Sequence, residues 1–342
     1  MPASTDVPFV SVIVPVRNMG KTIWSLMESL MNLDYPKDCH EIILVDGDSK
    51  DDTREIVKEY PVALIDQEGR GCNAARNTGV KHSKGEIIAF TDGDCIVPPN
   101  WIRLIASNFT DPGVNFVGGL VRAYDRLDPL SVYLEETFFP ITPRFRWRTE
   151  TTNLGLLHFP AGANMAFRRR ALEKIGFFDE RIFYGFEDLD AVEELGKRGF
   201  KIVLDPEVVV WHQHRTSLRE ILKQHFNYGR GGTLLLVHKR ASQLAHWFAI
   251  YLIYSSFVGI SIFVFLMTFG VMISHPLPIQ VGLWLFMITI ASIQLYYVPL
   301  ALKTKRLRKI LLYPLLDFAR GFGFTFGGLI QLFWSLGQRV TR

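Results

Sequence analysis

The first quarter of the chain alternates between short apolar runs and stretches whose apolar residues recur at helical spacing, and this alternation constrains the fold most. Strands that alternate with helices are joined by right-handed crossovers, so the pattern predicts a parallel, doubly wound α/β sheet. Neither the glycine fingerprint of dinucleotide-binding domains nor a P-loop occurs here. The predicted strands are residues 9–16, 41–45, 62–66 and 86–90, and the predicted helices are residues 21–31, 53–59 and 72–81.

The region that follows is less regular. We expect strands at 114–122 and 201–204 and helices at 168–175 and 189–198. Residues 130–147 mix aromatic side chains with arginines. This stretch fits a membrane-facing surface helix, a mobile substrate loop or a packed connector.

Asp92-Gly93-Asp94 follows the apolar run 86–90 directly. In open α/β sheets the ligand crevice lies at the carboxyl ends of the strands. Two carboxylates at i and i+2 in that place suit Mg²⁺ or Mn²⁺ shared with a diphosphate. The alternative is a solvated acidic turn, since Asp and Gly are ordinary turn residues.

The chain has no Asp, Glu, Lys or Arg from Ala241 to Leu302. A run of this length is enough for two membrane spans of about 20 residues each, and the prolines near its middle separate them. A third candidate contains Asp317 and Arg320, which are three apart and can pair on one helix face. The predicted spans are residues 247–273, 279–302 and, as the third candidate, 310–336.

Basic residues flank the predicted spans. Lys239-Arg240 precede the first span, and five lysines and arginines lie between 303 and 309, so the positive-inside rule places both flanks in the cytoplasm. A third span would put Arg342 outside, and an interfacial helix is the alternative. We therefore expect a multi-pass protein of the cell membrane whose α/β domain lies in the cytoplasm. The net charge of +4 is concentrated here and favours anionic membrane lipids rather than nucleic acid.

Several further motifs occur in a fixed order along the chain. They are the segments 12–18, 45–53, 71–79, 92–94, 160–169 and 185–190. In order and spacing they resemble the family-2 inverting glycosyltransferases with the GT-A fold. The resemblance implies a GT-A domain, α/β with a doubly wound, mostly parallel, Rossmann-like sheet. The expected domains are residues 1–240, including an interfacial helix at about 216–232, and a membrane domain at 241–342.

The resemblance also implies a donor side of the site. A nucleotide-sugar, linked to UDP or GDP, would be bound with Mg²⁺ or Mn²⁺. A carboxylate at the end of a strand accepts the N–H of a uracil or guanine, and an arginine suits phosphate oxygens. The implied nucleotide-binding residues are Pro15, Arg17, Asp46, Arg76 and Asp92. Asp94 and Asp92 are the implied metal ligands, with His212 as a further candidate.

The acceptor side follows from the same motifs. Gly162 and Asn164 belong to the implied acceptor-side loop. Asp188 is the implied base, and Glu187 is its neighbour. His212 and Arg230 would lie near the leaving diphosphate. Four of the implied site residues also have a plainer interpretation. Asp46 would be a helix cap or turn residue, and Arg76 would form a surface salt bridge. Glu187 and Asp188 would be ordinary acids in the first turn of a helix. Gly47-Asp48 reverses the order frequent in the family, which leaves any role for Asp48 in doubt.

The acidic pair at residues 187–188 indicates which chemical group accepts the sugar. A sugar hydroxyl benefits from a general base, whereas a phosphate acceptor is already an anion. We therefore expect a hexosyltransferase that glycosylates a hydroxyl of a lipid-linked glycan or related membrane acceptor. The alternatives are a polyprenyl-phosphate sugar synthase and a non-catalytic membrane scaffold or transporter with a vestigial nucleotide-binding domain.

Overall fold

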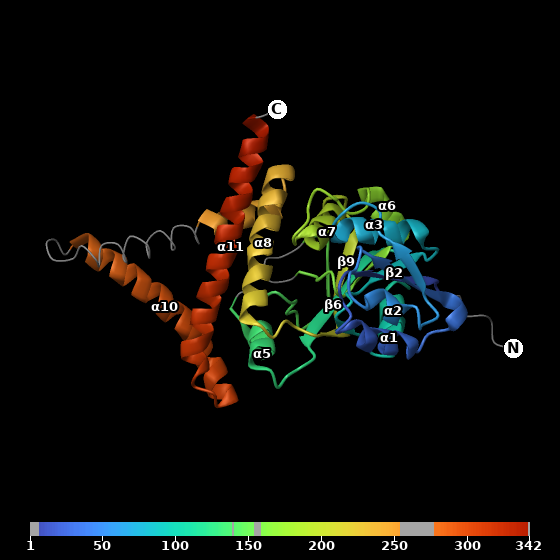
Figure 1. Ribbon diagram of the computed structural model, residues 1–342, viewed down its shortest axis with the longest axis horizontal. Coiled ribbons are helices and arrows are strands. Elements are labelled where there is room, and N and C mark those ends of the chain that lie inside the picture. Colours follow the sequence, from blue (N-terminus) through green and yellow to red (C-terminus); the bar gives the residue numbers. More distant parts are fainter. Residues whose placement is uncertain (1–6, 139, 154–158, 254–276, 341–342) are drawn as a thin grey trace. The chain divides into compact units, whose positions relative to one another are not determined.

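The computed structural model describes residues 7–138, 140–153, 159–253 and 277–340 (Figure 1). The chain divides into two compact units. Unit 1 comprises Met1–Glu135 and Pro140–His214, and unit 2 comprises Glu136–Phe139 and Arg215–Arg342. The predicted boundary at residue 240 differs from this division, which assigns the helix that follows residue 214 to unit 2.

Within the described residues, unit 1 is built on one nine-stranded sheet with the order β3-β2-β1-β4-β8-β6-β9-β5, and β7 pairs with β9 off this path. The strands β1 to β4 pair in parallel, as predicted, whereas β8 pairs antiparallel with both β4 and β6. The sheet is therefore mixed rather than mostly parallel. The strands are β1 Val10–Val16, β2 His40–Asp46, β3 Ala63–Asp66, β4 Ile87–Phe90, β5 Cys95–Ile96, β6 Val114–Ala123, β7 Thr149–Thr151, β8 Met165–Arg168 and β9 Lys201–His212.

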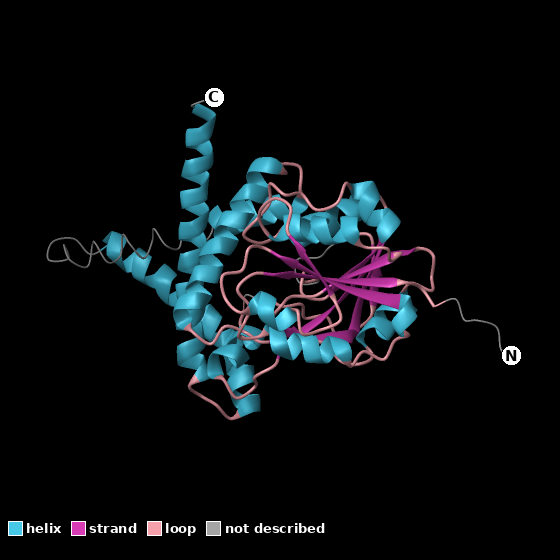
Figure 2. Cartoon of the chain, turned by 45° about the vertical axis from the view of Figure 1, so that its right-hand side comes forward, coloured by secondary structure: helices cyan, strands magenta, loops and turns pink. Residues whose placement is uncertain are grey.

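Helices cover both faces of this sheet (Figure 2). Two apolar clusters form the core of unit 1, and alternate residues of β1 belong to different clusters. Val12 and Val14 lie in the first cluster and Ile13 lies in the second. The first cluster includes residues of α1 Ile23–Met31, α2 Thr53–Val57 and α4 Trp101–Asn108. The second includes residues of α3 Cys72–His82, α6 Arg169–Ile175 and α7 Glu187–Lys197.

The stretch 130–147 is not one helix. The helix α5, Pro129–Glu136, covers its beginning, and the described residues between α5 and β7 form no helix. Phe145 is buried with the second cluster, whereas Trp147 is exposed. Phe145 is therefore packed as expected for a connector, whereas Trp147 is not.

The long helices of unit 2 within the described ranges are α8 Leu218–His238, α10 Leu277–Thr304 and α11 Lys309–Val340. The helices α8 and α11 pack closely because glycines face the partner backbone. A Cβ atom on Gly229 would lie 1.8 Å from the carbonyl oxygen of Phe324, and one on Gly327 would lie 2.0 Å from that of Phe226. Larger residues at these positions would push the helices apart.

A buried polar network joins the segment Glu136–Phe139 to the helices of unit 2. The hydroxyl of Thr137 bonds to Asp317, and Tyr297 bonds to the same carboxylate. Arg320 donates to Thr137, to Asp317 at 3.3 Å and to Nε2 of His225 at 2.8 Å. The predicted pairing of Asp317 with Arg320 on one face of a helix is therefore confirmed.

Among the described residues, we find no helix that combines the length and the apolar character needed to cross a membrane. The predicted span 247–273 falls mainly on residues outside the described ranges, while 279–302 falls on α10 and 310–336 on α11. In α11, glycines and the buried Asp317–Arg320 pair dilute the apolar sequence. The expectation of C-terminal transmembrane helices is not supported.

Candidate functional site

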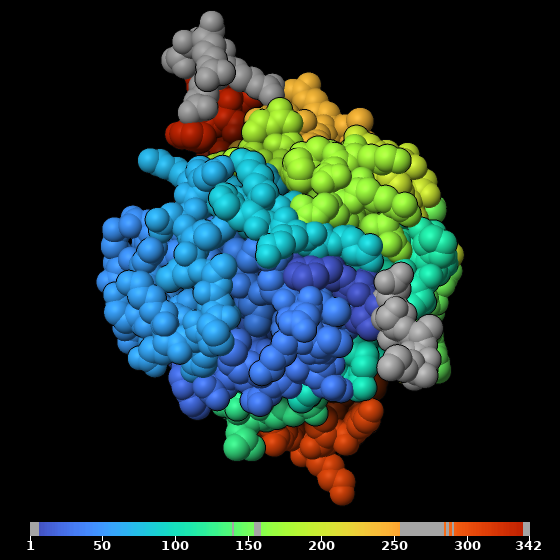
Figure 3. All heavy atoms as spheres, turned by 90° about the vertical axis from the view of Figure 1, so that its right-hand side faces the viewer, coloured from blue at the N-terminus to red at the C-terminus, as the bar shows by residue number. Residues whose placement is uncertain are grey.

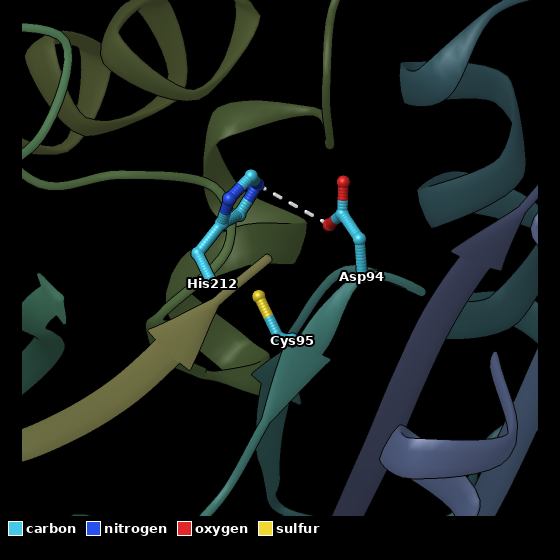
Figure 4. Close-up of side chains that lie close together, drawn as sticks. All are labelled: Asp94, Cys95 and His212. Carbon is cyan, nitrogen blue, oxygen red and sulfur yellow. Dashed lines mark ion pairs between the residues drawn. The ribbon is translucent and has the colours of Figure 1, made fainter. Parts of the chain in front are cut away.

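The turn after β4 and the end of β9 meet at one edge of the sheet. The antiparallel pairing of β5 with β9 places Cys95 opposite His212, directly after Asp94. Figure 4 shows the side chains of Asp94 and His212 pointing toward each other, with Cys95 beside them. Nε2 of His212 lies 3.2 Å from Oδ1 of Asp94, and one ligand atom from each of the three residues lies within 4.8 Å of the others.

This cluster fits a hard divalent cation. The carboxylate of Asp94 and the imidazole of His212 supply an oxygen and a nitrogen, which suit Mn²⁺ or Mg²⁺. Burial raises the pKa of Cys95 well above its ordinary value, and Asp94 adds to that effect. A sulfur ligand is also soft and suits Mg²⁺ or Mn²⁺ less well than oxygen and nitrogen do, so Asp94 and His212 would hold the ion.

Arg76 lies on α3 beside this edge and is 3% exposed. Its Nη1 lies 3.4 Å from Oε1 of Glu187, and its Nη2 lies 3.9 Å from Oδ1 of Asp92. Its Nε has no hydrogen-bond partner among the described residues. A buried guanidinium with long contacts and an unused donor is equipped to bind a further anion.

Asp188 is held at the start of α7 by backbone donors. The N–H of Gly162 donates to its Oδ2 at 2.6 Å, and the N–H of Leu189 donates to its Oδ1 at 2.9 Å. A Cβ atom on Gly162 would lie 2.4 Å from Nη2 of Arg76 and 3.3 Å from Oδ2 of Asp188. Glycine is needed at 162 because the guanidinium and this carboxylate approach it so closely.

Glu187 faces the same arginine. Its Oε2 is buried and accepts no hydrogen bond from a described residue. Burial raises the pKa of Glu187, Arg76 opposes that shift, and Asp188 adds to it. Burial likewise raises the pKa of Asp92, with Arg76 again opposing. The site thus gathers Asp92, Glu187 and Asp188 around one cation.

Asp46 ends β2 and is 1% exposed. It does not cap α2, whose N-cap residue is Asp52. Pro15 pairs with Val45 in the sheet, and Arg17 is exposed just after β1. Since Val16 pairs with Asp46, the ends of β1 and β2 lie side by side.

Two further predicted residues make hydrogen bonds within their own units. The amide of Asn164 is fully buried, where it donates to the carbonyls of Leu120 and Val208 and accepts from the indole of Trp101. These bonds use its donors within the protein interior and join strands of the sheet, and an acceptor-side role for Asn164 stays a prediction. Arg230 lies on α8 in unit 2, where its Nε donates to Gln331, and a diphosphate role for it stays a prediction.

Sequence reasoning missed the residues that anchor α3. Asn73 donates to the carbonyls of Asp179 and Ile182, and Asn77 donates to that of Phe178. In Figure 3 the segment of α3 lies against the yellow-green segment that follows α6. Buried asparagines on a helix with few large apolar residues were the available signal. Asp48, by contrast, is exposed, has φ 64° and pairs with Lys50.

Comparisons with known proteins agree with this architecture. The model for "Glycosyl transferase family 2" matches residues 11–176. The chain is 30% identical over 243 residues to "Glycosyltransferase AglE" of Haloferax volcanii, covering 67% of this chain and 74% of that protein. It is 23% identical over 260 residues to a Methanococcus voltae dolichyl N-acetyl-alpha-D-glucosaminyl phosphate 3-beta-D-2,3-diacetamido-2,3-dideoxy-beta-D-glucuronosyltransferase, covering 67% and 74%.

A solved structure shares the fold. The mannosyltransferase PcManGT of Pyrobaculum calidifontis, in complex with GDP-Man and Mn²⁺, superimposes with a TM-score of 0.60 at 19% identity, covering 97% of this chain and 89% of that one. The fold is thus of the GT-A type, and the protein is an enzyme that transfers glycosyl groups. The chain belongs to glycosyl transferase family 2.

Proposed function

We propose that this enzyme uses Mg²⁺ or Mn²⁺ to transfer a sugar, with inversion, from a nucleotide-sugar to a hydroxyl of a lipid-linked glycan. The observation that carries the proposal is the convergence of Asp92, Glu187 and Asp188 on the buried Arg76. These residues come from the β4 turn, α7 and α3, and the Asp94–His212 cluster adjoins them through Asp94. The ion in PcManGT supports a divalent cation here as well.

On the donor side, Asp46 accepts a hydrogen bond from the base, and Arg76 donates to a ribose or phosphate oxygen. The unused Nε of Arg76 and its long contacts leave it donors for this purpose. When bound, the divalent cation neutralises charge on the leaving nucleoside diphosphate. Asp94 and His212 would hold it there, and Asp92 faces the ribose or sugar.

On the acceptor side, Asp188 takes the proton of the attacking hydroxyl. Its position is fixed by the N–H groups of Gly162 and Leu189, which keep one carboxylate orientation. Glu187 orients the acceptor beside it. The hydroxyl attacks the anomeric carbon from the face opposite the diphosphate, so the configuration inverts. A carboxylate base is needed for a hydroxyl and not for a phosphate acceptor.

We also propose that the enzyme works at the cell membrane with unit 1 on the cytoplasmic side. Unit 2 supports this through a surface where apolar and basic side chains alternate. The name of the Methanococcus voltae relative, which includes a dolichyl phosphate, supports it too. Bilayers with anionic headgroups attract such surfaces. The exposed residues concerned are Leu302, Lys303, Lys305, Arg306, Leu307, Arg308, Leu311, Leu312 and Leu315.

A transfer assay tests the proposal. Purified full-length enzyme is given a panel of nucleotide-sugars, Mn²⁺ and either a lipid-linked saccharide or polyprenyl phosphate. We expect transfer to the saccharide hydroxyl, inverted anomeric configuration in the product, and loss of activity with EDTA. Transfer to polyprenyl phosphate alone would instead identify a polyprenyl-phosphate sugar synthase.

Vesicle flotation tests the membrane part separately. We expect binding to vesicles that contain anionic lipid, and weaker binding when Lys305 and Arg306 are changed to glutamate. Equal recovery with and without vesicles would contradict a membrane location while leaving the transfer reaction unaffected.

A further inference from the structure

The two oxygens of the Asp46 carboxylate differ in their hydrogen bonds. Oδ2 accepts the N–H of Ser49 at 3.1 Å and Nη1 of Arg54 at 2.8 Å. Oδ1 is buried and accepts no hydrogen bond from any described residue. Buried polar atoms without a partner are rare in proteins, so this oxygen is available to accept a hydrogen bond from a bound ligand.

Arg54 is held firmly in this position. The same Nη1 also lies 2.6 Å from Oδ1 of Asp66, the last residue of β3, so the guanidinium bridges the ends of two neighbouring strands. Burial raises the pKa of Asp46, but the hydrogen bonds from Ser49 and Arg54 hold it below its ordinary value. The carboxylate is therefore ionised at neutral pH and can only accept hydrogen bonds.

The main chain beside this carboxylate carries no side chain, because the next residue is Gly47. A Cβ atom there would lie 2.8 Å from Oε1 of Gln67 and 3.5 Å from Cβ of Arg17. Both neighbours are long, flexible side chains, and Arg17 is exposed. The far end of the Gln67 side chain can move aside for an incoming planar base.

We propose that Arg54 selects the nucleobase: by filling Oδ2, it leaves Asp46 one accepting oxygen and so favours uracil over guanine. This inference rests on the proposed function. Uracil presents a single ring N–H between two carbonyl groups. Guanine presents two neighbouring donors, its N1–H and its 2-amino group, which match both oxygens of a free carboxylate.

The guanidinium acts in two ways. It occupies the oxygen that the second donor of guanine needs, and its positive charge lies where that amino group would approach. A donor left unpaired in a buried site lowers affinity by about ten- to hundredfold. A carbonyl oxygen of uracil in the same place would instead be attracted by that charge. Discrimination therefore combines an attractive contact with a repulsive one.

Isothermal titration calorimetry tests the inference on the full chain with UDP, GDP and Mn²⁺. We expect UDP to bind wild-type enzyme at least about tenfold more tightly than GDP. Arg54→Met removes the charge at similar length and should bring the GDP/UDP affinity ratio about tenfold closer to one. Arg54→Lys, which keeps a cation, should retain most of the preference for UDP.

Lys50→Met is the matched control, because Lys50 is an exposed cation in the same turn that pairs with Asp48 instead. It should leave the ratio unchanged. The wild-type measurement decides the matter even where a variant folds poorly. Equal or tighter binding of GDP by the wild-type enzyme would overturn the role of Arg54, whereas failure of both nucleotides to bind would overturn the proposed function itself.

Discussion

Two buried arginines, one in each unit, are used in opposite ways. Arg76 and Arg320 are each 3% exposed; Arg76 lies near the carboxylates of Asp92 and Glu187, and Arg320 pairs with that of Asp317. Arg320 bonds to Thr137 at 2.6 Å and to His225 at 2.8 Å, and its acid Asp317 is in turn bonded by Tyr297. Arg76 makes contacts of 3.4 and 3.9 Å, and its Nε has no partner among the described residues.

The difference separates a structural network from a binding site. A buried polar network whose members bond to one another stabilises one arrangement, whereas unused donors and acceptors are costly unless a ligand meets them. The same residue types therefore have different roles, and the hydrogen bonds rather than the residue types tell them apart. The comparison can be tested by changing one acid at a time.

The largest effect is expected from Asp94→Asn. The variant should lose metal-dependent nucleotide binding and keep the wild-type melting temperature, since an ion clamped on a diphosphate contributes several kcal/mol. Calorimetry with nucleoside diphosphate and Mn²⁺ measures the first, and thermal unfolding measures the second. Asp48→Asn, at an exposed pair, is the control and should change neither. Unchanged Mn²⁺-dependent affinity in Asp94→Asn would refute the metal role.

Asp317→Asn should have the reverse pattern. Removing one member of a buried ion pair costs about 3–5 kcal/mol because the other charge remains buried. We expect a marked loss of stability in urea unfolding, with nucleotide affinity unaltered in the folded fraction. Arg198→Ala, which breaks an exposed pair with Glu194, should cost only a few tenths of a kcal/mol. A neutral Asp317→Asn would mean that the network of unit 2 is not structural.

Asp188→Asn sharpens the comparison within unit 1. Transfer should fall by roughly a hundredfold or more, the usual size of a general-base effect, while nucleotide binding is retained. Single-turnover kinetics and calorimetry separate the two quantities. Glu193→Gln, on the same helix and paired with Lys197, is a suitable control. Wild-type transfer by Asp188→Asn would show that another base acts or that the acceptor is a phosphate.

The smallest effect concerns pH. Burial lowers the pKa of His225 from 6.5 to about 3, and the nearby Arg320 adds to this. The folded protein therefore keeps this imidazole neutral. Its contribution to the free energy of unfolding is complete above pH 6.5 and declines as the pH falls toward 3. Over that range the free energy of unfolding changes by about 1.4 kcal/mol per pH unit. Hydrogen exchange in α8 at pH 7 and pH 5 measures it, and His225→Gln should flatten the dependence.

Much of unit 1 could be predicted from the sequence, for a physical reason. Parallel strands buried on both faces are short apolar runs, and their order along the chain determines which carboxyl ends meet. This reasoning leads to Asp46, Asp92 and Asp94. The antiparallel strand β8 was missed because Met165–Arg168 has no alternation to distinguish it from the helix that follows.

The remaining site features depend on contacts that sequence spacing does not contain. Arg54 reaches Asp46 eight residues back and Asp66 twelve residues on, through side-chain geometry alone. Asn164 belongs to a motif of the family, yet its amide is used entirely by the sheet and Trp101. In unit 2, apolar composition indicated membrane spans, but composition does not show which helices pack on one another through their glycines.

The short segment Glu136–Phe139 has a consequence for how the protein is made. Thr137 bonds to Asp317, 180 residues later in the chain. At synthesis rates of about 5–20 residues per second, the ribosome takes roughly ten to forty seconds to produce that partner. Throughout that time the hydroxyl of Thr137 and the carboxylate of Glu136 have yet to meet Asp317 and Lys309. The catalytic part of the chain thus leaves the ribosome carrying a segment whose partners do not yet exist, and that segment is completed only when the last helix arrives.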